Sequence, residues 1–166
     1  MKMYSIGDKV VHPRYGPGRI LSIESRELMD GPKRYYTLIV PDQALTVYVP
    51  VRRTKELGIR PAMARSRLPA VLDTLGSPPR DLPEDHKERQ EQVYELLTTG
   101  RVMQVAKVVR DLFWHRHRAH LTRKDTDYLK QGQDLLAAEM ALACGDEIPD
   151  MNQLIESTLD MAMGTL

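Results

Sequence analysis

The sequence predicts an α+β protein built from two modules, a small antiparallel β-barrel followed by a helical bundle. Up to about residue 50, short segments rich in Val, Ile, Thr and Tyr alternate with turns that contain Gly, Pro and Asp. From Pro69 onward, apolar residues recur at the spacing of amphipathic helices. We therefore expect a β module over residues 1–65 and a helical module over residues 66–166.

Four strands are expected in the β module, with the sequences GDKVVHP, GRILSIESREL, KRYYTLIV and LTVYVPV. The segments between them, RYGPG, MDGPK and PDQA, hold the residues that tight turns require. Four strands are too few for a two-sheet sandwich, whereas a strongly bent barrel buries one strand face and limits exposed edges. A connector is expected around residues 51–68.

Four or five helices are expected in the second module. LPAVLDTL is separated by the proline-rich SPPRDLP from EDHKERQEQVYELLTTG, which Gly100 ends. The next helix is RVMQVAKVVRDLFWHRHRAHL. Thr122 and Asp125 then have the spacing of a capping box for a long helix, and PDMNQLIESTLDMAM is a last short one.

Charge is distributed unevenly along a chain whose formal net charge is only +1. Residues 101–124 hold 7 basic and 1 acidic side chains, whereas residues 125–166 hold 1 basic and 9 acidic ones. This asymmetry indicates either a nucleic-acid contact or two helices that pair their charges within the module. Both interpretations stay open at the level of sequence.

The only tryptophan lies in the basic segment RDLFWHRHRAHLTRK. At about 100° per residue, Val105 and Leu112 share one apolar face, and Trp114 falls on the opposite side. The cations around Trp114 are Lys107, Arg110 and Arg118. We expect Phe113 in the core, the three cations exposed and Trp114 partly accessible, as a phosphate-contacting surface or as packing against another helix.

Enzymatic and metal sites are not indicated. His115, His117 and His120 point in different directions on one continuous helix and cannot converge on a metal ion. No nucleophile motif, carboxylate pair or glycine-rich phosphate loop accompanies them, so we expect no enzyme, no cofactor and no small-molecule substrate. The single Cys144 fits a reducing compartment, and no apolar run approaches the ~18 residues of a membrane span, which predicts a cytoplasmic protein.

A family resemblance rests on four stretches in order: GDKVVHPRYGPGRILSIESRE, LTVYVP, TGRVMQVAKVVRDL and LLAAEMALA. From about residue 4 to residue 144 the chain resembles the bacterial CarD-type transcription regulators, whose N-terminal domain is similar to the polymerase-interacting module of transcription-repair coupling factors. The resemblance implies a Tudor-like or SH3-like barrel that binds the RNA polymerase β subunit. It also implies a helical module that contacts promoter DNA at the upstream edge of the bubble and modulates open-complex stability.

On the barrel, the resemblance implies polymerase contacts at Arg26, Leu28 and Tyr48. Arg26 matches the family's contact arginine on the second strand, and Leu28 matches its apolar neighbour. Tyr48 stands where the family often has a second arginine, so one charge-assisted contact is absent. We expect these residues to share an exposed surface of the sheet.

On the helical module, the resemblance places His86 where the family has a tryptophan that enters the minor groove. A histidine offers far less apolar area for a wedge between base pairs. Glu88 and Glu91 occupy positions that are commonly basic, which leaves Lys87 and Arg89 as the nearby cations. The DNA contact is expected at His86, Lys87 and Arg89, or at the surface of Lys107, Arg110, Trp114 and Arg118.

Two other functions remain open from the sequence. In an adaptor, the helical module would bind protein instead of DNA, and the basic face also suits an RNA-binding module. Salt-dependent retention on duplex DNA separates the DNA-binding regulator from the adaptor.

Overall fold

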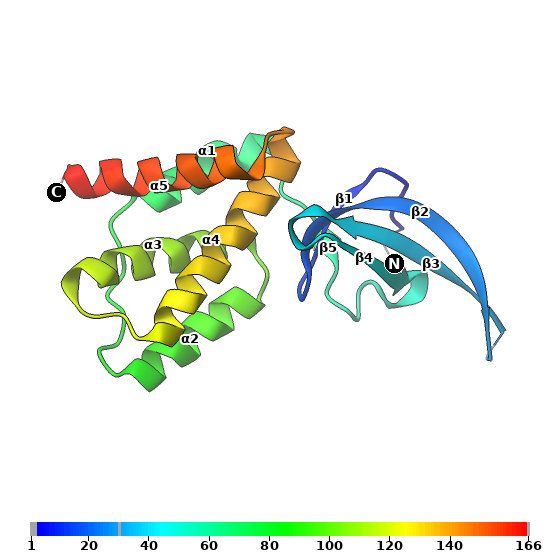
Figure 1. Cartoon of the computed structure of the whole chain (residues 1–166), viewed down its shortest axis with the longest axis horizontal. Coiled ribbons are helices and arrows are strands. Elements are labelled where there is room, and N and C mark those ends of the chain that lie inside the picture. Colours follow the sequence, from blue (N-terminus) through cyan, green and yellow to red (C-terminus); the bar gives the residue numbers. More distant parts are fainter. Residues whose placement is uncertain (1–2, 30, 166) are drawn as a thin grey trace. The chain divides into compact units, whose positions relative to one another are not determined.

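The computed structural model describes residues 3–29 and 31–165. The chain divides into two compact units, one that ends at Ala62 and one that begins at Met63. Within the described residues, the first unit is an antiparallel sheet and the second contains five α-helices (Figure 1). The predicted α+β architecture with a β module followed by helices is confirmed.

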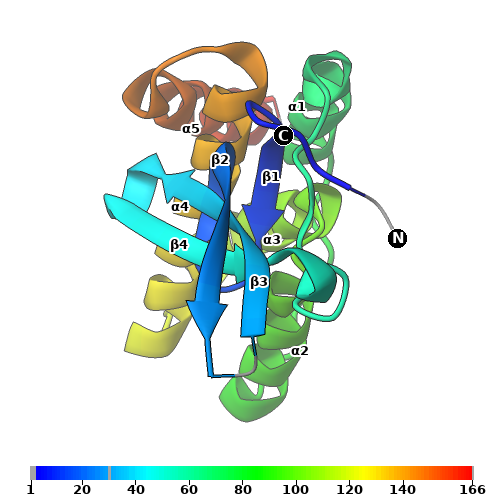
Figure 2. The same ribbon diagram turned by 90° about the vertical axis from the view of Figure 1, so that its right-hand side faces the viewer.

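The sheet of the described residues has five antiparallel strands in the order β4-β3-β2-β1-β5. Their bounds are β1 Lys9–His12, β2 Gly16–Leu28, β3 Gly31–Val40, β4 Leu45–Pro50 and β5 Arg60–Pro61. A register shift between Ile20 and Ser22 interrupts the β2–β3 pairing, and such bulges bend a strand. Figure 1 shows the curved hairpin of β2 and β3, and Figure 2 shows the same two strands side by side after a turn of 90°. The four predicted strands are present, whereas β5 was not predicted because two residues carry no periodic pattern.

One face of the sheet is buried and the other is partly exposed. The buried face is formed by side chains that include Val10, Ile20, Tyr36, Leu38, Val40 and Val49. The hydroxyl of Tyr36 accepts a hydrogen bond from the backbone N–H of Tyr4 at 2.9 Å, which ties the chain before β1 to β3. Successive strand residues point to opposite faces, so the intervening positions of β2, β3 and β4 form an outer face.

The five helices are α1 Leu68–Gly76, α2 His86–Thr98, α3 Val102–Arg118, α4 Arg123–Cys144 and α5 Ile148–Gly164. The predicted capping box is present: the Thr122 hydroxyl accepts from the backbone N–H of Asp125, and the Asp125 carboxylate accepts from that of Thr122. Gly100 has a φ of +67° just beyond α2, where a left-handed residue ends the helix as predicted. The third helix ends at Arg118, however, earlier than the predicted Leu121.

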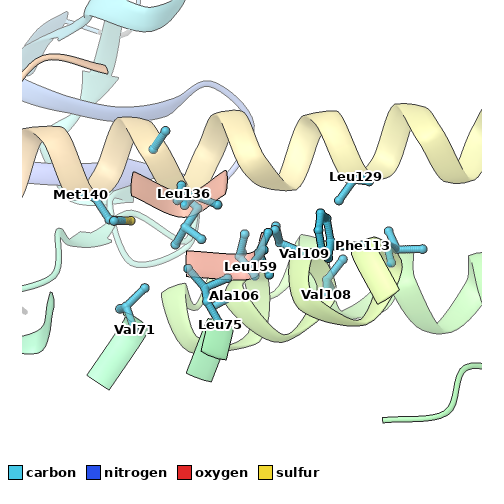
Figure 3. Packing of buried hydrophobic residues seen from close by; sticks show 14 of the residues in the cluster. Val71, Leu75, Ala106, Val108, Val109, Phe113, Leu129, Leu136, Met140 and Leu159 are labelled. Atoms are coloured by element: carbon cyan, nitrogen blue, oxygen red, sulfur yellow. The ribbon is translucent and has the colours of Figure 1, made fainter. Parts of the chain in front are cut away.

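The core of the helical unit is organised around α3, which contacts each of the other four helices. Leu75 of α1, Phe113 of α3, Leu136 of α4 and Leu159 of α5 are all buried in it (Figure 3). This confirms the predicted position of Phe113. In the described part of the chain, no helix combines the length and the apolar composition needed to cross a bilayer.

Candidate functional site

Arg26 and Tyr48 lie together on the outer face of the sheet. Arg26 on β2 pairs in register with Lys33 of β3, and Tyr48 on β4 pairs with Thr37 of β3. The Cζ atom of Arg26 lies 4.0 Å from the centre of the Tyr48 ring, which is a cation–π contact. The structure thus joins two of the three residues expected at the polymerase surface. The third, Leu28, ends β2, and its side chain lies outside the described residues.

The pair of Arg26 and Tyr48 is available to a partner. Arg26 is exposed, and 46% of Tyr48 is accessible to solvent. Among the described residues, no carboxylate forms an ion pair with Arg26. The contact with the ring restrains the guanidinium, and its N–H donors can bind an acceptor on another protein.

Arg89 is buried in the helical unit, with an exposed fraction of 3%. Its guanidinium donates to both carboxylate oxygens of Asp125, from Nε at 3.1 Å and from Nη2 at 2.6 Å. Its Nη1 donates to the carbonyl oxygens of Pro83 and Glu84. The expectation that Arg89 is a surface cation for DNA is therefore wrong, because its donors hold α2 against the start of α4.

Asp125 receives this arginine in a fully buried position. Burial opposes its ionisation, but the hydrogen bonds from Arg89 and from the N–H and hydroxyl of Thr122 outweigh burial, so the pKa of Asp125 lies below its ordinary value. Folding is therefore favoured by this carboxylate above about pH 4, and that contribution is lost as the pH falls through its lowered pKa.

Arg110 was expected on an exposed basic face and is instead buried, with 6% of its surface accessible. Its Nε donates to Asp111 at 2.9 Å, and its Nη1 donates to the Ser77 hydroxyl at 2.8 Å and to the Thr74 carbonyl at 3.3 Å. The helical wheel of α3 alone did not show that α1 and the segment after it pack over Arg110. Arg110 is therefore a structural residue, contrary to the prediction.

The remaining residues of that predicted face have different environments. Trp114 is partly buried and packs against the helical core, and its Nε1 is buried without a hydrogen-bond partner in the described part of the chain. Lys107 is only partly exposed. Arg118 has half of its side chain exposed and pairs with the carboxylate of Asp81. A continuous cationic face on α3 is therefore not formed.

His86 and Lys87 are exposed in the first turn of α2. The turn is capped by Asp85, whose carboxylate accepts from the N–H of Glu88 at 3.0 Å. Glu88 and Glu91 are also exposed, so the surface around His86 carries both signs of charge.

Beside His86, a cleft of about 770 Å³ is lined by three histidines. His86 comes from α2, His115 from the last turn of α3, and His120 from the loop that follows α3. This convergence was not predicted from the sequence, because α3 was expected to continue through His120 and His86 lies on a different helix. No group of three or more His, Cys, Asp or Glu side chains in the described ranges is arranged to hold a metal ion.

Comparisons with known proteins agree with this architecture. The family model described as "CarD-like/TRCF RID domain" matches residues 4–63, and the model "CarD, C-terminal domain" matches residues 70–156. A Bacillus subtilis (strain 168) protein described as "Putative transcription factor YdeB" is 28% identical over 145 residues, which cover 86% of this chain and 94% of that protein. The sheet thus corresponds to an RNA polymerase-interacting domain and the helices to the C-terminal domain, and the chain belongs to the CarD family of transcription regulators.

Proposed function

We propose that the protein is a non-enzymatic transcription regulator that binds the β subunit of RNA polymerase through the outer face of its sheet. Its helical unit contacts promoter DNA near the upstream edge of the bubble and thereby modulates the stability of the open complex. The observation that carries the proposal is the exposed Arg26–Tyr48 pair on a domain of the polymerase-interacting type.

The chemistry of this pair suits a protein partner. Tyr48 supplies a broad apolar ring, and Arg26 supplies a charge that no carboxylate of the described chain neutralises. Tyrosine and arginine are the residue types that most often dominate the binding energy of protein interfaces. The outer face should therefore bind a polymerase surface that offers an acidic or carbonyl acceptor beside an apolar patch.

The test is the affinity of the full chain for purified RNA polymerase. Arg26→Glu should weaken binding at least about tenfold, which corresponds to about 1.4 kcal/mol, because it reverses the charge and removes the cation from the Tyr48 ring. Arg34→Glu is the matched control, since Arg34 is exposed on β3 but points to the other side of the same hairpin. Equal affinities of the two variants would remove Arg26 from the interface.

The DNA contact is proposed at the exposed start of α2, where His86 and Lys87 lie. Phosphate contacts make the affinity for duplex DNA fall as the salt concentration rises. Each lost contact flattens the slope of log affinity against log salt concentration by about one unit. Lys87→Gln should therefore flatten the salt dependence of binding to a short duplex and weaken binding to all sequences alike. A parent protein that shows no salt-dependent binding would contradict the DNA contact.

The second candidate is an adaptor whose helical unit binds protein. It is favoured by the exposed carboxylates of Glu88 and Glu91 beside His86, which repel DNA phosphates, and by the burial of Arg89 and Arg110. For an adaptor, Arg26→Glu would still weaken polymerase binding, whereas duplex DNA would not be retained at any salt concentration.

A further inference from the structure

Three histidines from separate segments of the helical unit line one cleft. They are His86 at the start of α2, His115 at the end of α3, and His120 in the loop before α4. His86 and His120 are exposed, and His115 is partly buried. Histidine is the side chain whose charge changes between pH 5 and 8, so three of them around one cavity make its charge dependent on pH.

The wall of the cleft is held in place by the buried ion pair of Arg89 and Asp125. Arg89 lines the cleft and also binds the carbonyl oxygens of Pro83 and Glu84, which fixes the chain just before α2. Thr122 also lines the cleft and accepts a hydrogen bond from the Gln90 side chain at 2.9 Å. The loop that carries His120 is therefore tied to α2, and the cleft does not depend on a mobile lid.

The fixed charges around the cleft nearly cancel. They come from the segment before α2, from α2, from α3 and from the start of α4, and they are Asp81, Glu84, Arg89, Arg118 and Asp125. Two arginines thus face three carboxylates, and Asp85, Lys87 and Glu88 beside His86 add one further negative charge, which leaves two net negative charges while the histidines are neutral. Protonation of all three histidines would change the balance to one net positive charge.

We propose that this cleft binds a phosphate group, and that it does so when its histidines are protonated. The proposal rests on the proposed function in one respect, because the DNA backbone is the phosphate source that a regulator of this family would meet. The start of α2 at His86 is capped by the carboxylate of Asp85, so the attraction for an anion must come from the protonated histidines and the arginines of the cleft. A cleft of about 770 Å³ leaves room for a phosphodiester with its adjoining sugar.

The sign of the pH effect follows from the charges. A histidine has an ordinary pKa of about 6.5, and a bound phosphate raises that pKa. The cleft should therefore bind phosphate most tightly at a pH below the pKa of its histidines, and its affinity for phosphate should fall as the pH rises through that pKa. The pKa of His115 lies below the ordinary value, first because of burial and then because of Arg89 and Arg118, which outweigh Asp125 and Glu84. His115 therefore takes up a proton at a lower pH than an ordinary histidine does.

The first experiment measures the affinity of the full chain for a short labelled DNA duplex between pH 5.5 and pH 8 at constant ionic strength. The parent affinity should rise as the pH falls, by up to about tenfold per pH unit for each proton taken up on binding. A variant with His86→Gln and His120→Gln should lose most of this rise. Both side chains are exposed, so the variant should fold like the parent.

The matched control is His117→Gln. His117 is an exposed histidine of α3 that lies against Phe113 and does not line the cleft, so this variant should keep the pH dependence of the parent. A pH dependence that is lost equally in the control, or that survives in the double variant, overturns the proposal.

The second experiment adds inorganic phosphate and follows the imidazole signals by NMR at pH 5.5 and pH 8. Signals of His86 and His120 should shift at the lower pH and stay in place at the higher pH, while His117 stays in place at both. If these shifts occur but no duplex binds at any pH, the cleft proposal stands with free phosphate as its ligand and the DNA contact fails. If a duplex binds equally at every pH and phosphate moves no histidine signal, the cleft proposal is overturned and the DNA contact stands.

Discussion

Arg26 of the sheet and Arg89 of the helical unit were both expected at contact surfaces, yet their environments are opposite. Arg26 is exposed and stacks on an aromatic ring, whereas Arg89 is buried and donates to a carboxylate and two carbonyl oxygens. The carboxylate that holds Arg89 comes from Asp125, 36 residues further along the chain. An arginine therefore becomes structural when the fold brings an acceptor to it, whatever the charge of its neighbours in sequence.

The two environments have different energetic consequences. An exposed cation over a ring contributes about 0.5–1 kcal/mol, so Arg26 can change partners at little cost to the fold. Removal of one member of a buried pair leaves an uncompensated charge in the interior, which is far more costly. Substitutions in the helical unit should therefore act on stability first, and substitutions on the outer sheet face should act on binding.

The largest effect is expected for Asp125→Ala, which leaves the Arg89 guanidinium buried without its carboxylate. The free energy of unfolding should fall by about 3–5 kcal/mol, measured by urea denaturation. Asp127→Ala is the control, since Asp127 is exposed on the same helix. A loss below about 1 kcal/mol for Asp125→Ala would show that the pair contributes no more than a surface salt bridge.

A smaller effect is expected for Trp114→Ala. Trp114 packs on the helical core but is partly exposed, so the free energy of unfolding should fall by about 2–3 kcal/mol, less than for a fully buried aromatic residue. Duplex affinity at a fixed pH should stay at the parent value in the same samples. Weaker duplex binding by a stably folded variant would instead return Trp114 to the DNA surface.

The smallest effect on stability is expected for Arg118→Gln. Its partner Asp81 has 87% of its side chain exposed, so the pair should contribute less than about 1 kcal/mol to the free energy of unfolding. The substitution also removes one positive charge from the histidine cleft, so duplex binding at pH 5.5 should weaken. A marked loss of stability would place Arg118 with Arg89 and Arg110 as a structural arginine.

Local sequence patterns predicted most of the elements. Strand alternation, turn residues and helical periodicity act over a few residues, so the four main strands and the five helices could be read directly from the chain. The capping box of Thr122 and Asp125 is equally local and was predicted. The exceptions were β5, which is too short for a pattern, and the end of α3 at Arg118, where a helix stops without Gly or Pro to mark it.

The chain's own residues thus determined its two-module α+β architecture and carried its resemblance to the CarD family, because periodicity and motif order are properties of the sequence. Only the tertiary structure decided which cations are exposed to solvent and which histidines line the same cleft. Arg89 and Arg110 became internal because distant acceptors pack against them, and His86 joined His115 and His120 because three separate segments converge at one cleft. Burial and convergence depend on contacts between residues far apart in the chain, which neither charge counts nor a single helical wheel contains.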